Sequence, residues 1–152
     1  MSIHAPKTLI ALGLALLAGC QDAPAPPAPP EVASLGRLLP NVREDLEQAT
    51  DAVRKDPRNW TAWGHLGMRY EVHGAPGLAL QCYTVAAENL PNDAKMPYRA
   101  AVAAARAGSP DVALRWLDRS LKLDPNYCTS YYRRGTWLLD LGRMEEARAA
   151  FQ

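Results

Sequence analysis

The hydrophobic and polar positions of this 152-residue chain follow three successive patterns. Residues 8–19, TLIALGLALLAG, form an uncharged apolar run, and residues 23–30, APAPPAPP, are too rich in proline for helix or sheet. From residue 41 onward, apolar residues recur at helical spacing, beginning with Val42, Leu46, Ala49 and Val53. The pattern predicts an apolar leader, an extended proline-rich segment and a helical domain.

The first helix is predicted to begin at Asn41 and to end before Asp56-Pro57. Asn41 is a suitable N-cap, because its side chain can accept a hydrogen bond from the first turn. Proline lacks a backbone N–H and clashes with the preceding turn, so Pro57 ends the helix.

Three sets of residues then recur at intervals of 34. They are Pro57, Pro91 and Pro125; Gly74, Gly108 and Gly142; and Ala79, Ala113 and Ala147. Internal repetition at this period indicates a solenoid of helix-turn-helix units.

Residues 60–93 carry a finer signature, which consists of Trp63, Leu66, Gly67, Tyr70, Ala79, Tyr83, Ala86 and Pro91. Through these residues the chain resembles the tetratricopeptide repeat (TPR) family over residues 41–152, strongly in 60–93 and weakly in 41–56. The resemblance implies an all-α, right-handed superhelix. Gly67 and Ala79 are expected where two helices cross closely, and Trp63 and Tyr70 between successive repeats.

The resemblance divides the helical part of the chain into four units. They are a degenerate half-repeat at 41–59, a first repeat at 60–93, a degenerate second repeat at 94–127 and a third repeat at 128–152. Pro97 of the second repeat falls in the first turn of a helix, where proline is tolerated. The last repeat leaves Phe151 without a following unit or polar cap, so we expect the natural protein to continue beyond Gln152.

The stretch Leu17-Ala18-Gly19-Cys20 indicates how the chain is targeted. As a helix, the apolar run before it reaches only ~18 Å, short of the ~30 Å hydrocarbon core, which is typical of a signal peptide over residues 1–19. The four residues resemble the lipobox of bacterial lipoproteins, which implies cleavage before Cys20 and a diacylglyceryl group on its sulfur. An ordinary signal peptide with an accidental cysteine is the alternative.

Gln21, rather than aspartate, follows the cysteine, which in enterobacterial lipoproteins favours the outer membrane, here facing the periplasm. Residues 20–40 are then a lipidated, proline-rich tether that holds the folded part clear of the lipid head groups. The PxxP pattern could alternatively be a ligand for an SH3-type domain.

Charge and motifs exclude several function classes. Removal of residues 1–19 leaves 16 basic and 16 acidic residues, which gives no electrostatic reason to expect nucleic acid as a partner. The chain has no glycine-rich phosphate loop and no GxSxG, HExxH or CxxC motif. His65 and His73 lie ~12 Å apart on one helix, too far to share a metal. We therefore expect no enzymatic activity, no metal and no cofactor.

Cys82 and Cys128 are separated by a whole repeat, whereas a disulfide requires Cα atoms within ~7 Å. They are predicted to be two separate, largely buried thiols, with a disulfide as the alternative.

In the TPR family, the first helix of each repeat lines a concave groove. The corresponding slots hold Gly64, Met68, Glu71 and Val72, then Lys95, Tyr98, Val102 and Arg106, then Thr129, Tyr132, Thr136 and Asp140. Of these we expect Met68, Glu71, Lys95, Tyr98, Arg106, Tyr132, Thr136 and Asp140 to contact a partner. Tyr98 and Tyr132 occupy the same slot and are expected side by side along the groove, or else in packing between repeats.

The resemblance argues against one subtype, the chaperone-tail clamp. In that subtype, Lys and Asn of the first repeat bind the terminal carboxylate, and the matching positions here hold Gly64 and Met68. The Lys position of the third repeat holds Thr129, although Arg133 matches the Arg position.

Three functions are compatible with the sequence. The first is a scaffold in the cell envelope, anchored to the membrane by the lipid on Cys20, that binds envelope proteins or peptides in its groove. The second is the docking module of a longer envelope enzyme whose catalytic domain follows Gln152. The third is self-association of the repeats.

Overall fold

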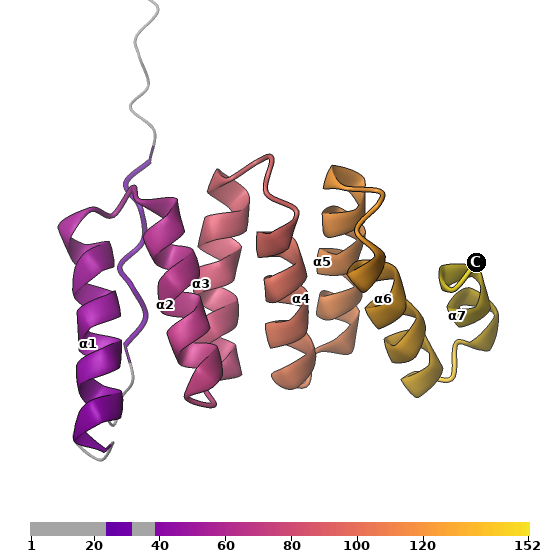
Figure 1. The fold of residues 1–152 in the computed structure, drawn as a ribbon, viewed down its shortest axis with the longest axis horizontal. Helices are drawn as coiled ribbons and strands as arrows, with labels where there is room; N and C mark the ends of the chain where they lie inside the picture. Colours follow the sequence, from indigo (N-terminus) through magenta and orange to yellow (C-terminus); the bar gives the residue numbers. More distant parts are fainter. Residues whose placement is uncertain (1–23, 32–38) are drawn as a thin grey trace, which may run out of the picture.

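The computed structural model describes residues 24–31 and 39–152, which include seven helices and no strand. The helices are α1 (Pro40–Lys55), α2 (Trp60–Val72), α3 (Pro76–Asn89), α4 (Lys95–Arg106), α5 (Pro110–Leu123), α6 (Cys128–Asp140) and α7 (Met144–Ala150). They stand side by side in one row in which each helix follows its neighbour in sequence (Figure 1). The predicted all-α helix-turn-helix solenoid is confirmed.

The turns inside the three repeats share one backbone geometry. Gly74, Gly108 and Gly142 have φ values of 74°, 79° and 73°, in the left-handed region that glycine adopts without a steric penalty. At the first of these turns, the amide of Gly74 donates to the carbonyl of Glu71 and the amide of Ala75 donates to that of Tyr70. This Schellman pattern ends α2 and directs the chain into α3.

Helix α1 begins one residue earlier than the sequence predicted. Pro40 is its first residue, and Leu39 is an N-cap without a side-chain hydrogen bond, so the prediction that Asn41 caps the helix is wrong. Proline is well suited to the first helical position because its fixed φ is helical and the amide it lacks would have no partner there. Asn59 does cap α2, since its Oδ1 accepts from the amide of Ala62 at 3.1 Å.

The core repeats one contact in register. A Cβ atom added at Gly67 would lie 2.8 Å from the ring of Tyr83, and one added at Gly135 would lie 2.3 Å from the ring of Phe151. These pairs are two repeats apart, and Ala101 with Leu117, both fully buried, occupies the same two slots between them. A small residue on the first helix therefore matches a large one on or directly after the second helix in every repeat.

Trp63 and Tyr70 are each 1% exposed, as the prediction that they fill the space between repeats requires. The indole Nε1 of Trp63 donates to the carbonyl of Pro57 at 3.0 Å and so fixes the α1–α2 turn. Farther along, the core between α5 and α6 is partly polar, because the buried hydroxyls of Ser120 and Ser130 lie 3.0 Å apart.

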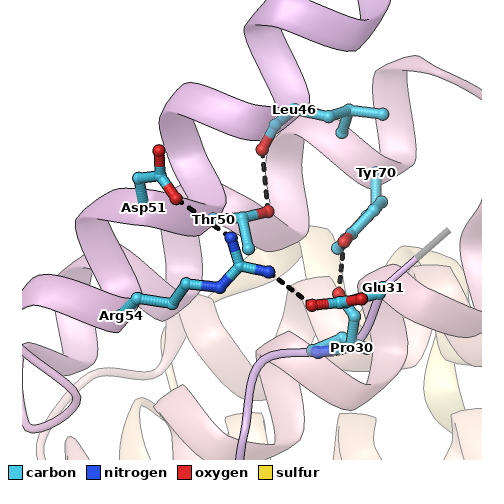
Figure 2. A network of polar contacts seen from close by, with 7 residues as sticks. All are labelled: Pro30, Glu31, Leu46, Thr50, Asp51, Arg54 and Tyr70. Atoms are coloured by element: carbon cyan, nitrogen blue, oxygen red, sulfur yellow. Dashed lines mark hydrogen bonds and ion pairs between the residues drawn. The ribbon is translucent and has the colours of Figure 1, made fainter. Parts of the chain in front are cut away.

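The proline-rich segment does not stand free of the helices. Residues 24–31 have no helix or strand, as predicted, and run alongside α1 and α2 (Figure 1). The Tyr70 hydroxyl donates to the carbonyl of Pro30 at 2.5 Å, and Glu31 pairs with Arg54, which also pairs with Asp51 (Figure 2). This docking was not predicted from the sequence.

None of the helices in the described part of the chain combines the length and apolar character that crossing a membrane requires. Residues 1–19 and the proposed lipid site at Cys20 lie outside the described residues.

Candidate protein-binding surface

The first helices of the three repeats meet at an open pocket of about 420 Å³. Its lining comes from α2, α4 and α6 and consists of Glu71, Val102, Ala105, Arg106, Arg133 and Trp137. We call it the central pocket. It combines an acidic, two basic and several apolar side chains, so it can bind a peptide through charge and apolar contact together.

Glu71 is fixed at one side of the central pocket by two partners. The Tyr83 hydroxyl donates to Oε2 at 2.8 Å, and Nη1 of Arg106 lies 3.3 Å from Oε1. Burial raises the pKa of Tyr83, and the bond to Glu71 raises it further, so the phenol remains a donor. Glu71 thereby connects α2, α3 and α4 at the pocket.

Arg133 and Trp137 form the other side of the central pocket, one turn apart on α6. The guanidinium of Arg133 is exposed and makes no ion pair that the structure records within the described residues. Glu71 therefore balances the charge of only one of the two arginines. The pocket suits an acidic group that lies next to an apolar side chain.

The structure separates the residues that the sequence assigned to one groove. Glu71 and Arg106 line the central pocket, whereas Met68 lines a different hollow between α1 and α2. Lys95 and Asp140 are exposed and line neither of these two. The hydroxyl of Thr136 is bonded to backbone carbonyls of its own helix.

The two tyrosines predicted to lie side by side each contact a different ring. Tyr98 meets Tyr127 edge-on with centroids 5.3 Å apart, and Tyr132 lies 6.3 Å from Phe151. Both pairs lie within a single repeat, the first at the end of residues 94–127 and the second within residues 128–152. Tyr132 keeps 63% of its surface exposed and could still contact a partner.

Sequence reasoning missed Trp137 and passed over Arg133 as a binding residue. Trp137 occupies the slot that holds Ala103 one repeat earlier. The same position holds Arg69 in the first repeat, so a large aromatic residue that appears only in the third repeat was the available signal.

The two remaining thiols are unbridged, as predicted. Cys82 is buried, which raises the pKa of its thiol to about 12. Cys128 is exposed at the start of α6, so the prediction that both are largely buried is wrong for this residue. Its position at the first residue of the helix leaves it outside the core.

His73 contributes to the contact between α1 and α2, whereas His65 is exposed. Nε2 of His73 lies 2.9 Å from Oδ2 of Asp45, whose other oxygen is 3.4 Å from Arg69. The described residues contain no group of three His, Cys, Asp or Glu side chains arranged to hold a metal.

Comparisons with known proteins agree with this architecture. No curated protein matches the sequence. A crystal structure of MamA superposes with a TM-score of 0.66 at 22% identity and covers 70% of this chain. MamA residues 41 to the end from Desulfovibrio magneticus RS-1 give a TM-score of 0.67 at 15% identity and cover 73%. At these identities the likeness supports the fold.

The chain spans 62% and 63% of the lengths of those two structures. The family model for the tetratricopeptide repeat matches residues 43–94, 79–127 and 98–152, which together take in every helix from the first turn of α1 to the last residue. The chain belongs to the tetratricopeptide repeat family.

Proposed function

We propose that this protein is an interaction scaffold of the bacterial cell envelope, which is anchored by a lipid on Cys20 and binds a partner protein at the central pocket. The observation that carries the binding site is the meeting of Arg133 and Trp137 on α6 with Arg106 and Glu71 from two other helices. Arginine and tryptophan are the residue types that most often anchor interfaces. The chemistry favours a peptide segment with an acidic residue beside an apolar one.

The anchor and the docked proline-rich segment together orient the scaffold. Cys20 precedes Pro24 by four residues, which span at most ~14 Å even when fully extended. Because Pro30 and Glu31 are bonded to α2 and α1, a lipid on Cys20 would keep the N-terminal end of the solenoid near the membrane. The tether then acts as a short attachment at this end of the solenoid.

The test is a pull-down from detergent-solubilised envelopes, with the full chain as bait and quantitative mass spectrometry as readout. Truncating an interface anchor costs about 2 kcal/mol or more, so Arg133→Ala and Trp137→Ala should each reduce capture at least ~10-fold. Lys122→Ala, which removes an exposed charge from α5, is the matched control and should not change capture. Equal capture by all four baits would refute the pocket assignment.

The anchor is tested separately with Cys20→Ser. This variant should leave the membrane fraction and fail to incorporate labelled palmitate, while its purified form still binds the captured partner. Absence of palmitate label on the wild-type chain, or equal labelling of the Cys20→Ser variant, would refute lipidation at Cys20.

A further inference from the structure

A second hollow, of about 540 Å³, lies between α1 and α2 at the N-terminal end of the solenoid. Ala49 and Ala52 of α1 and Ala62, Met68 and Arg69 of α2 are among its lining residues. We call it the N-terminal hollow. It is distinct from the central pocket and shares none of its lining residues.

The 34-residue register shows what kind of object fits this hollow. A shift by one repeat carries Ala49 onto Tyr83 of α3 and Ala62 onto Met96 of α4. Both of these residues contact α2: the Cβ position of Gly67 lies 2.8 Å from Tyr83, and that of Gly64 lies 3.0 Å from Met96. The surface of α3 and α4 that is equivalent to the N-terminal hollow is therefore the surface on which α2 packs. We call this surface the seat of α2.

The rest of the seat follows the same register. Val72, which lines the hollow, corresponds to Arg106, and Arg106 pairs with Glu71 of α2. The residues that hold α2 in place thus have counterparts in the hollow, and these counterparts have no helix packed on them within the described part of the chain.

The proline-rich segment does not fill the hollow. Glu31 pairs with Arg54, which follows the hollow-lining Asp45 by nine residues and so lies ~180° around α1 at 100° per residue. Residues 24–31 are therefore docked on the opposite side of α1. The seven residues from 32 to 38 that join them to α1 amount to at most two helical turns, shorter than a helix such as α2.

Side-chain size specifies the occupant. On α2, the glycines at positions 64 and 67 face the large side chains of Met96 and Tyr83. The hollow has alanine in place of both, so it accommodates larger apolar residues at those two slots, three positions apart on the incoming helix. His65 and Arg69 line its α2 side and Asp45 lines its α1 side, and Arg69 pairs with Asp45 at 3.4 Å, so this edge of the hollow is polar.

We propose that the N-terminal hollow binds an amphipathic helix of a partner protein, which completes the first repeat by lying on α1 and α2 as α2 lies on α3 and α4. The helix presents two large aliphatic residues, at positions i and i+3, to Ala62 and Ala49. The interaction extends the solenoid by one helix and leaves the central pocket free for a different segment.

Two probe peptides test this proposal directly. Both have the sequence of residues 60–72, which is the helix found in the equivalent seat, and carry a fluorophore and a staple between positions 61 and 65 because a free helix of this length is marginal in water. One retains glycine at positions 64 and 67, and the other carries Gly64→Leu and Gly67→Leu. Fluorescence anisotropy with the full chain in mild detergent measures their affinities.

The wild-type chain should bind the leucine peptide at least ~10-fold more tightly than the glycine peptide. An Ala49→Tyr/Ala62→Met variant carries the side chains found in the seat of α2 and should reverse this preference. Ala52→Arg, at an exposed position of the hollow, should abolish binding without affecting folding. Arg133→Ala/Trp137→Ala alters only the central pocket and should leave both affinities unchanged.

An unchanged preference in the double variant would overturn the proposal, as would the absence of binding to the wild-type chain below ~1 mM. Loss of peptide binding in the Arg133→Ala/Trp137→Ala chain would also overturn it, because the peptide would then occupy the central pocket.

Discussion

Gly67 has the most sharply defined environment in the core and gives the most informative substitution. It lies on α2 where this helix crosses α3, directly against the Tyr83 ring. The ring is fully buried, and its hydroxyl is bonded to Glu71 at 2.8 Å. A methyl group added at Gly67 therefore meets a side chain that is held at both ends.

The cost of Gly67→Ala follows from the geometry. The new Cβ atom would lie 2.8 Å from two ring atoms, whereas ordinary contact is 3.4–4 Å, so the ring or the helix must shift. Overpacking of this kind costs about 1–3 kcal/mol, and the higher helix propensity of alanine returns at most about 1 kcal/mol. We expect a net loss of about 1–2 kcal/mol in the free energy of unfolding.

The assay is urea denaturation followed by far-ultraviolet circular dichroism. Gly77→Ala is the matched control, because a Cβ atom at this helical position meets nothing within 4 Å, and it should not lower stability. Tyr83→Leu with Gly67→Ala recreates the Ala101–Leu117 pair of the second repeat. In the Tyr83→Leu background, Gly67→Ala should therefore be neutral or stabilising. Additivity of the two substitutions to within about 0.5 kcal/mol would refute the ring clash as the reason for glycine.

Other contacts of the described residues are tested by smaller changes. Tyr70→Phe removes the donor to Pro30 and should cost about 1 kcal/mol in the same assay, whereas Arg54→Ala breaks an exposed ion pair and should cost less; equal losses would contradict this ranking. In a Cys20→Ser chain, a thiol reagent near neutral pH should modify Cys128 at once and Cys82 only on unfolding. Burial raises the pKa of Cys82 from 9.0 to about 12, so the folded state retains a proton that the unfolded chain releases. Stability should therefore fall from pH 9 to pH 12, by roughly 1.4 kcal/mol per pH unit from this group, and Cys82→Ser should reduce the slope.

The fold was predictable because its determinants recur in sequence. Gly74, Gly108 and Gly142 set the three turns through backbone geometry alone, and spacing reveals such positions directly. The sequence also indicated that Gly67 lies where two helices cross closely, although its contact with Tyr83 was not predicted. The start of α1 was not predictable in this way. Asn41 is a favoured N-cap residue, but Pro40 is equally favoured as the first residue of a helix, and the helix begins at Pro40.

The candidate site was predictable only as far as the helices that line it. Slots identify which face of a helix points into the groove, and Glu71 and Arg106 are found there. The position of a residue in the repeat does not determine which side chain of α6 lines the central pocket. Trp137 lines it in place of the predicted Thr136. The docking of Pro30 on Tyr70, 40 residues away, depends on tertiary structure that no local pattern contains.

Helix α1 contacts the docked proline-rich segment and also forms one wall of the N-terminal hollow. Each element of a solenoid is stabilised mainly by its neighbours, and within the described chain the main helical neighbour of α1 is α2. Contacts of the proline-rich segment with Arg54 and Tyr70 hold α1 on one side, and the N-terminal hollow opens on the other. Whatever loosens the first contact also loosens one wall of the hollow. Docking of the proline-rich segment and the proposed binding of a partner helix would therefore stabilise the same helix, and each should favour the other.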